Sequence, residues 1–415
     1  MYETALPPET RRLISTMDPA RVVVGIPSYR NLNTVGAVVE VVAEGLDQHF
    51  RHLDPVLVST DGHSFDQTLE IAMATPVTST VRRVGTRYYG LPGKGSAIRS
   101  ILEIAVSLGA RACAVVEADV TSMEPDWIPA LVGPVLSGEY DMIVPRYFYQ
   151  RPLAGSNDLL AAPLLQSLFG NTLCTPLAGE FAVSGFLAGR MSAKDVWETD
   201  VARAGINVWL TTTAILDGFK LGQVRLGERI HQSPGRGPAN GKFIQQMGTL
   251  FRLAWLYCRR WREGTNPLPI PLHGRWPPRS HAASNSWPPA APVLAAAHKG
   301  VGRYINSVWP RILLPETLAN VRESFVNEPY TFPPDLWAQI VYDFFVVYNK
   351  GDGDPDRVIE ALFPLYHARL AAFLETGSAL GEAGREALLE EQAASFRNML
   401  PRLLERWATY IPWSS

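Results

Sequence analysis

Up to about residue 230, short apolar runs alternate with helix-length amphipathic stretches, and this alternation constrains the fold more than any other feature. The runs that predict strands are "RVVVGIPSY", "PVLVSTDG", "STVRRVG" and "ACAVVEAD", the third as an edge strand and the last as a buried central one. The stretches that predict helices between them are "NTVGAVVEVVAEGLDQHF", "SFDQTLEIAMA" and "KGSAIRSILEIAVSLG". Strands and helices that alternate in this way form βαβ units, so the sequence predicts an α/β fold with a mainly parallel sheet.

The composition changes after residue 260, where "NPLPIPLHGRWPPRSHAASNSWPPAAPV" is crowded with proline. Proline interrupts helices and central strands, so this stretch predicts an extended connector on the surface. Beyond it, apolar residues recur every three or four positions, which predicts helices. We therefore expect an N-terminal arm at 1–20, an α/β domain at 21–258, a connector at 259–305 and a helical domain at 306–415.

Charge and cysteine content exclude several classes of protein. The chain has 38 Lys and Arg against 40 Asp and Glu, so no overall field favours nucleic acid or an anionic membrane. The three cysteines are widely spaced, which fits reduced packing residues better than a disulfide framework or a zinc site. The first residues lack the pattern of a secretory leader, and no apolar run approaches the length of a membrane span. These features predict a cytoplasmic protein without membrane spans.

Two carboxylates, Glu117 and Asp119, stand one residue apart where the predicted central strand ends. Open α/β sheets bind ligands at the carboxyl ends of their strands, and a hard divalent cation prefers oxygen ligands. The pair therefore indicates a divalent-cation site. The alternative is a solvated strand end, because unpaired charges are costly to bury.

Other polar loops are expected at the same edge. "GIPSYRN" and "STDGHSFD" end the first two strands, and Asp61 in the second can accept a hydrogen bond from a base or ribose, although Asp-Gly is also ordinary turn chemistry. Lys94 begins a helix between glycines, where it can face a phosphate or simply be solvated. Arg229 and His231 stand at alternate positions, so both side chains can point the same way.

Several familiar motifs are absent. "GKGS" has the letters of a phosphate-binding P-loop in the wrong order, and no G-x-S-x-G, H-E-x-x-H or G-x-G-x-x-G follows a predicted strand. The sequence therefore argues against a P-loop enzyme, an esterase, a zincin and an NAD enzyme.

The order I-P-S-Y-R-N, S-T-D-G, G-K-G, E-A-D, P-L-A-G-E-F and E-R-I-H resembles the retaining GT-A glycosyltransferases that make glucosyl- or mannosylglycerate and their 3-phosphoglycerate forms. In that family the corresponding segments are a P-A-L-N-E type loop, a D-S-G-S type turn, G-K-G, D-x-D, P-L-G-G-E-Y and R-x-H. The resemblance covers roughly residues 20–250. It implies a GT-A fold, a Rossmann-like and mostly parallel sheet flanked by helices, with a nucleotide-sugar half at about 21–120 and an acceptor half at about 121–258. The helical extension beyond it is an expectation from periodicity.

The resemblance implies roles on the donor side. Asp119 and His231 match the metal ligands, with Mg²⁺ or Mn²⁺ as the cofactor, and a mixed carboxylate and imidazole pair favours Mn²⁺ or a tolerant site. Glu117 stands where the family has the first acid of D-x-D, and whether it touches nucleotide, metal-bound water or only its own loop stays open. Lys94 and Arg229 would neutralise phosphate charge, Arg229 as a catalytic residue. The donor nucleotide would be bound by Pro27, Tyr29, Asn31, Ser59, Asp61, Lys94, Glu117 and Ala118.

The acceptor side is implied in the same way. Glu180 is expected to hold sugar hydroxyls as a catalytic residue, and the alternative is a buried glutamate with a structural partner. Asn207 stands where the family often has an acid, which puts an acid-dependent role there in doubt. The acceptor would be bound by Arg146, Arg151, Leu177, Ala178, Gly179, Asn207 and Thr211.

The expected reaction is therefore metal-dependent transfer of glucose or mannose, with retention, from a UDP- or GDP-sugar to D-glycerate or 3-phospho-D-glycerate. A sugar-1-phosphate nucleotidyltransferase is the alternative enzyme, although "IPSYRN" lacks the G-x-G-T-R pattern of that class, and a non-catalytic sugar or nucleotide sensor is the third reading. Trp337, Tyr342, Phe344 and Phe345 exceed what one helix face can bury. They fit either a homodimer surface or an intramolecular core.

Overall fold

The computed structural model describes residues 3–148, 155–232, 239–264, 266–276, 287–326 and 330–412. The chain forms two compact units, each of which combines distant segments. Unit 1 takes the described residues of Met1–Tyr149, Leu177–Gly237 and Ile270–Ala282, and unit 2 those of Gln150–Pro176, Pro238–Pro269 and Ala283–Ser415. No helix in the described part of the chain is long and apolar enough to cross a membrane.

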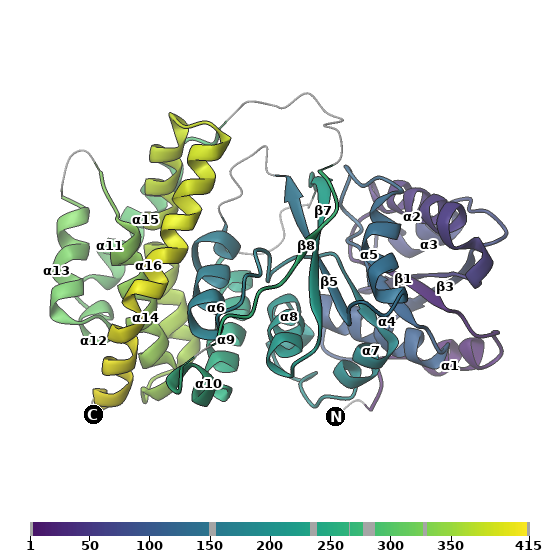
Figure 1. Ribbon diagram of the computed structural model, residues 1–415, viewed down its shortest axis with the longest axis horizontal. Coiled ribbons are helices and arrows are strands. Elements are labelled where there is room, and N and C mark those ends of the chain that lie inside the picture. The colour runs from purple at the N-terminus through teal and green to yellow at the C-terminus, as the bar shows by residue number, and fades with distance from the viewer. Residues whose placement is uncertain are drawn as a thin grey trace. The chain divides into compact units, whose positions relative to one another are not determined.

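Unit 1 is built on a mixed sheet, which in the described residues has eight strands in the order β3-β2-β1-β4-β6-β5-β7-β8 (Figure 1). The strands are β1 (Val22–Ser28), β2 (Val56–Asp61), β3 (Arg82–Arg87), β4 (Ala112–Val115), β5 (Met142–Phe148), β6 (Phe181–Ser184), β7 (Leu221–Glu228) and β8 (Leu272–His273). All pair in parallel except β6, which runs antiparallel to both β4 and β5. The expected α/β fold with a mostly parallel sheet is confirmed.

Alternation along β1 explains how helices cover both faces of this sheet. Val22, Val24 and Ile26 join a core with α2 (Val35–Phe50) and α5 (Trp127–Leu136). Gly25 instead faces Ile101 of α4 (Lys94–Ser107) so closely that a Cβ atom there would overlap it. The helices of unit 1 are α1 (Pro8–Ser15), α2 (Val35–Phe50), α3 (Thr68–Ala74), α4 (Lys94–Ser107), α5 (Trp127–Leu136), α7 (Gly185–Ser192) and α8 (Ile206–Leu216), with short 3-10 turns η1 (Arg51–Leu53) and η3 (Asp200–Ala202).

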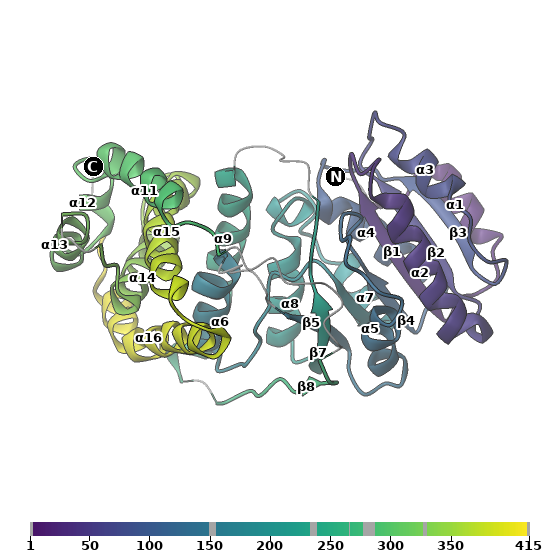
Figure 2. The ribbon, with the colours of Figure 1, turned by 90° about the horizontal axis from the view of Figure 1, so that it is seen from above.

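Unit 2 is helical in the residues that the structure describes (Figure 2). Its elements are a π-helical turn, η2 (Asn157–Ala161), and the helices α6 (Ala162–Phe169), α9 (Ala239–Leu256), α10 (Cys258–Arg262), α11 (Ala291–Tyr304), α12 (Trp309–Ile312), α13 (Pro315–Ser324), α14 (Pro334–Lys350), α15 (Pro355–Ser378) and α16 (Glu382–Thr409). Helices α14, α15 and α16 pack against one another, and α6 and α9 pack against them. The expected helical C-terminal region is confirmed.

The structure divides the chain differently from the boundaries expected from composition. Helices α6 and α9 lie within 21–258 but pack with the C-terminal helices, and most of α10 and all of α11 lie inside the expected connector. The connector also contributes β8, an edge strand beside β7. The aromatic side chains expected to form either a surface or a core, Trp337, Tyr342, Phe344 and Phe345, are fully buried within unit 2. They therefore form an intramolecular core.

Candidate active site

The candidate site lies where the parallel strands of unit 1 end. In β1 and β2, Ser28 stands beside Asp61, and in β1 and β4, Gly25 stands beside Val115, so the carboxyl ends of all three strands meet at one edge. The chain after β4 stays tied to this edge because Val116 N–H donates to Gly25 O at 3.0 Å. Glu117 and Asp119 follow directly, as the sequence predicted.

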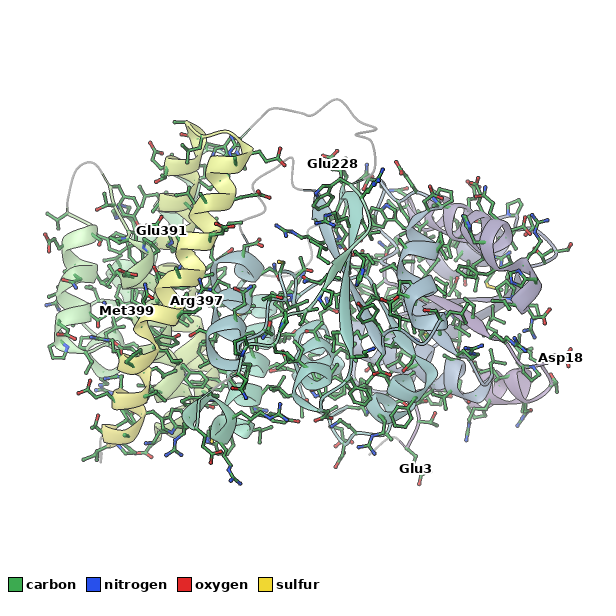
Figure 3. All side chains as sticks on the ribbon, viewed as in Figure 1. Glu3, Asp18, Glu228, Glu391, Arg397 and Met399 are labelled. Atoms are coloured by element: carbon green, nitrogen blue, oxygen red, sulfur yellow. The ribbon has the colours of Figure 1, made fainter. Side chains whose placement is uncertain are left out.

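A second segment, which follows β7, pairs with the residues that carry the carboxylates. Val120 and His231 form an antiparallel β-bridge, and Gln232 N–H donates to Asp119 O at 2.9 Å. Ser122 fastens the same two segments, because its hydroxyl donates to Glu228 O at 2.6 Å and accepts from Ile230 N–H at 2.8 Å. Figure 3 shows Glu228 at the carboxyl end of β7, where this segment begins. The bridge places the chain at His231 beside the chain at Asp119.

Five side chains form a continuous charge network next to this bridge: Lys94, Glu117, Arg229, Glu180 and Tyr147. Lys94 and Arg229 both form ion pairs with Glu117. Arg229 also pairs with Glu180, with Nε 3.1 Å from Oε2 and Nη2 3.3 Å from Oε1. The Tyr147 hydroxyl donates to Glu180 Oε2, and the Tyr147 ring lies 5.5 Å from the Arg229 guanidinium carbon. The network links residues from α4, β5 and three different loops.

Burial and neighbouring charges together set the protonation of Arg229 and Tyr147. Burial alone would lower the pKa of Arg229, but the charges of Glu180 and Glu117 raise it well above its ordinary value. Burial first, and then the charge of Glu180, raise the pKa of Tyr147 well above its ordinary value. Arg229 is therefore permanently charged and Tyr147 stays a hydrogen-bond donor at physiological pH.

Glu180, expected as a catalytic residue, and Gly179, expected at the acceptor, lie beside Arg229 and Glu117, and both expected roles stay predictions. Glu180 is 0% exposed, and its carboxylate faces Arg229 and Tyr147, which is the structural alternative considered for it. Gly179 is buried beside Glu117, and a Cβ atom at position 179 would lie 2.5 Å from Glu117 Oε1. Both residues thus belong to the charge network and its surroundings.

The loops expected to hold a nucleoside are ordered by a buried carboxylate. Asp61 is 0% exposed and accepts from both the N–H and the hydroxyl of Ser64, each at 2.7 Å. Asn31 holds its own loop, because its side chain accepts from Tyr29 N–H at 2.9 Å. Asp61 therefore fixes the turn after β2, as ordinary Asp-Gly turn chemistry would, and its donor-binding role stays a prediction.

The remaining expected donor residues differ in exposure. Tyr29 is exposed and Pro27 half-buried at the end of β1. Ser59 is buried in β2, and its hydroxyl has no hydrogen-bond partner in the described residues. Ala118 is buried, and its carbonyl accepts from the Thr34 hydroxyl at 2.7 Å. Tyr29 and Pro27 are thus the most accessible of these four to a base or ribose.

The expected acceptor residues lie partly together. Asn207, at the start of α8, donates from Nδ2 to Leu177 O at 3.2 Å, while Thr211 donates to Asn207 O at 3.1 Å. Asn207 is 7% exposed, and its Oδ1 has no hydrogen-bond partner in the described part of the chain. Ala178 is buried beside Leu177, and Arg146 is half-buried in β5. Arg151 lies outside the described residues.

Asp119 and His231, the expected metal ligands, carry a carboxylate and an imidazole, side chains that a divalent cation such as Mn²⁺ accepts. Asp119 is half-buried and His231 exposed. Arg229 Nη1 lies 3.3 Å from His231 Nδ1, and since a guanidinium can only donate, Nδ1 is the acceptor in this contact. A neutral imidazole has only one acceptor nitrogen, so a cation bound to Nδ1 would take the place of this contact. Among the residues that the structure describes, no cluster of three or more His, Cys, Asp or Glu side chains could hold a metal. A cation here would therefore need further oxygens from substrate and water.

Sequence reasoning missed two residues of the site, Tyr147 and Ser122. Tyr147 lies in β5, in the run "MIVPRYF", and nothing in that run indicates a partner 33 residues away. Ser122 lies three residues beyond Asp119, and its contacts with Glu228 and Ile230 depend on the bridge between distant segments. A polar residue at the end of an apolar strand was the available signal for Tyr147.

The chain is similar to three curated glucosyl-3-phosphoglycerate synthases. It is 30% identical to that of Mycolicibacterium smegmatis over 223 residues, which cover 50% of this chain and 69% of the relative. For that of Mycobacterium tuberculosis the identity is 27% over 231 residues, covering 50% and 65%, and for that of Mycolicibacterium paratuberculosis it is 29% over 230 residues, covering 50% and 64%. The chain thus spans about two thirds of the length of these relatives. No protein-family model matches the chain.

A crystal structure of the M. tuberculosis enzyme with Mn²⁺, UDP-glucose and phosphoglyceric acid shares 21% identity, covering 61% of this chain and 86% of that one, with a TM-score of 0.43. At that TM-score the likeness assigns no role to any residue here. The sequence relationship is the stronger finding, since one relative reaches 30% identity with most of its length covered. The chain therefore belongs to the glucosyl-3-phosphoglycerate synthase family of GT-A glycosyltransferases.

Proposed function

We propose that this chain transfers glucose from a nucleoside diphosphate glucose to 3-phospho-D-glycerate, with retention of configuration and with bound Mn²⁺ or Mg²⁺. The names of the curated relatives support glucose and phosphoglycerate as the sugar and acceptor. The structural observation that supports the proposal most is the bridge between Val120 and His231, which brings the segments of a carboxylate and an imidazole together beside two cationic side chains.

Asp119 and His231 would hold the cation, which would neutralise charge on the diphosphate as it departs. Lys94 and Arg229 would donate to the phosphate oxygens. Charge on these oxygens grows as the bond to the sugar breaks, so fixed cations stabilise the transition state more than the ground state. Pro27 and Tyr29 would contact the nucleoside, and Asn207 the acceptor or the sugar.

The burial of Glu180 bears on how configuration is retained. A covalent mechanism needs a carboxylate that reaches the anomeric carbon, but Glu180 is fully buried and faces Arg229 and Tyr147. We therefore favour attack of the acceptor hydroxyl on the same face from which the diphosphate leaves, with a leaving phosphate oxygen taking the acceptor proton. Mass spectrometry that found glucose bound to Glu180 during turnover would exclude this route.

The test is a matrix of donors and acceptors. UDP-glucose, GDP-glucose, UDP-mannose and GDP-mannose are each incubated with glycerate and with 3-phosphoglycerate in Mn²⁺, and products are identified by mass spectrometry. We expect glucosyl-3-phosphoglycerate and release of the nucleoside diphosphate. Formation of a nucleotide sugar from a sugar 1-phosphate and a nucleoside triphosphate, without any glycosyl transfer, would instead support a nucleotidyltransferase.

A further inference from the structure

The side chain of Glu117 has defined partners in the structure, whereas the sequence alone left three roles open for this residue. Its carboxylate forms one ion pair with Lys94 through Oε1 and another with Arg229 through Oε2. The two cations come from distant elements, the start of α4 and the segment after β7. Each carboxylate oxygen of Glu117 thus faces a different cation, and the carboxylate joins them.

The space for the Glu117 carboxylate between Lys94 and Arg229 depends on Gly179. Gly179 has no side chain to fill the position that the Glu117 carboxylate occupies. A Cβ atom there would lie 2.5 Å from Oε1 and 2.6 Å from Oε2 of Glu117, closer than such atoms approach in proteins. Gly179 has no positive φ that would require glycine for conformational reasons. Glycine is therefore needed at position 179 because a side chain there would occupy the space of the Glu117 carboxylate.

The charges of the network indicate what the Glu117 carboxylate does between Lys94 and Arg229. Lys94 and Arg229 carry two positive charges, and Glu117 and Glu180 carry two negative ones, so the group is close to neutral. A neutral group does not attract an anion strongly at a distance, but it holds its N–H donors in fixed directions. Lysine has three donors and arginine five, and the ion pairs leave some of them available for phosphate oxygens.

We propose that Glu117 is a positioning residue whose carboxylate bridges Lys94 and Arg229 and fixes both for the diphosphate of the donor, with Gly179 providing the room. Glu117 acts through the two cations and touches neither nucleotide nor metal. This inference rests on the proposed function, because it assigns the diphosphate of a sugar nucleotide to these cations.

Shortening the side chain at position 117 distinguishes the positioning role from direct contact of Glu117 with the nucleotide or the metal. The resembled family has an aspartate where this chain has Glu117, so Glu117→Asp keeps the charge and restores the family residue. If Glu117 touched ribose or metal-bound water, the aspartate would serve as well. If it bridges two cations, the shorter side chain cannot reach both. Gly179→Ala is a second variant that keeps every charge and displaces the Glu117 carboxylate.

The experiment measures two ligands separately. Inorganic pyrophosphate binding is followed by calorimetry in EDTA, and Mn²⁺ binding by electron paramagnetic resonance without nucleotide. We expect Glu117→Asp and Gly179→Ala each to weaken pyrophosphate binding by about tenfold, and to leave Mn²⁺ affinity unchanged. Gly133→Ala, at a helical glycine with open space around it, is the matched control and should change neither. Circular dichroism checks that each variant folds.

Two results would overturn the positioning role. Pyrophosphate binding that is unchanged in both variants would show that the cations do not depend on Glu117. Loss of Mn²⁺ affinity in Gly179→Ala, which displaces the Glu117 carboxylate, but not in Gly133→Ala, would make Glu117 part of the metal site. Failure of the proposed function is distinguishable, since it would appear as wild-type protein that binds pyrophosphate and Mn²⁺ but transfers no sugar.

Discussion

Val120 and His231 form an antiparallel β-bridge that joins the loop after β4 to the segment after β7. The two residues are more than a hundred positions apart. Val120 directly follows Asp119, a candidate metal ligand, and His231 lies two residues after Arg229, a candidate phosphate-binding cation. The bridge thus aligns a candidate metal ligand on one segment with a cation and a second candidate ligand on the other.

The metal assignment predicts that Asp119→Asn and His231→Ala each weaken Mn²⁺ binding by about tenfold or more, since each removes one of two protein ligands. Electron paramagnetic resonance of free and bound Mn²⁺ measures the affinity. Asp126→Asn is the control, because that carboxylate is largely exposed at the start of α5 and should not bind the metal. Unchanged Mn²⁺ affinity in both site variants would show that Asp119 and His231 do not bind the metal.

Tyr147→Phe removes the hydroxyl that donates to the buried carboxylate of Glu180. Leaving a buried acceptor with one fewer donor costs about 1–3 kcal/mol of folding free energy. We expect Arg229 to be held less firmly, so the KM for the donor should rise. Urea denaturation and steady-state kinetics measure the two effects, with Tyr89→Phe as the control because Tyr89 is 44% exposed. A donor KM unchanged in Tyr147→Phe would contradict the link to Arg229.

Asn207→Ala tests the buried amide whose Oδ1 has no partner in the described residues. A buried acceptor without a donor fits a hydroxyl supplied by a ligand. If that ligand is the acceptor substrate, its KM should rise by about tenfold while the donor KM changes little. The neighbouring Thr212→Val removes another partnerless buried hydroxyl from the same helix and should leave both KM values unchanged. Equal effects of the two variants would argue for a purely structural role.

A buried ion pair in unit 2 predicts unequal effects on stability. Asp343 is fully buried, with Oδ1 3.0 Å from Arg406 Nε, and it also accepts from Leu314 N–H at 3.0 Å. Burial raises the pKa of Asp343 although Arg406 opposes the shift. Arg406→Met leaves the carboxylate without its cation, which should cost about 3 kcal/mol at neutral pH. Asp343→Asn should cost less, because a neutral side chain is tolerated there.

The pH dependence of Arg406→Met follows from the same pKa. The pKa of Asp343 in the folded variant would lie above its value in the unfolded chain, so the folded state binds the proton more tightly. The contribution of protonated Asp343 to the stability of the variant is then fully present at acid pH and is lost as pH rises through the folded pKa of Asp343. Urea denaturation from pH 4 to 8 should show the cost of Arg406→Met shrinking toward pH 4. A cost that grows toward pH 4 would contradict this.

Cysteine reactivity tests the packing of unit 1. Cys113 is fully buried in β4, and burial raises the pKa of its thiol to about 12. Since the thiolate is the reactive form, Cys113 should resist iodoacetamide in the folded protein and react after unfolding. Cys174 and Cys258 are partly exposed and serve as internal controls. Mass spectrometry of labelled peptides distinguishes the three, and rapid labelling of Cys113 would contradict the buried strand.

Local patterns were enough to predict the sheet up to β4, because each strand there is an apolar run bounded by polar turns. They also placed Glu117 and Asp119 at the carboxyl edge, since the position of a strand end follows from the run that precedes it. The parallel strands β1, β2 and β3 lie where their sequences predicted, with β3 at the edge.

Local patterns could not reveal contacts between distant segments. The pairing of Glu117 with both cations, the burial of Glu180 and the contribution of Tyr147 each depend on packing across the sheet. The grouping of α6 and α9 with the C-terminal helices has the same origin, because an amphipathic helix does not show in its sequence which apolar surface it covers.

We propose that glucose transfer to phosphoglycerate depends on a metal bound at the edge that carries Asp119 and His231. The most direct measurement is the proton NMR spectrum of the product formed from UDP-glucose, 3-phosphoglycerate and Mn²⁺. We predict an α-linked glucosyl-3-phosphoglycerate that disappears with EDTA, returns with added Mn²⁺ and is not formed by Asp119→Asn. An equal yield of that product from the Asp119→Asn variant, or from wild-type protein in EDTA, would show that the transfer does not depend on a metal at Asp119.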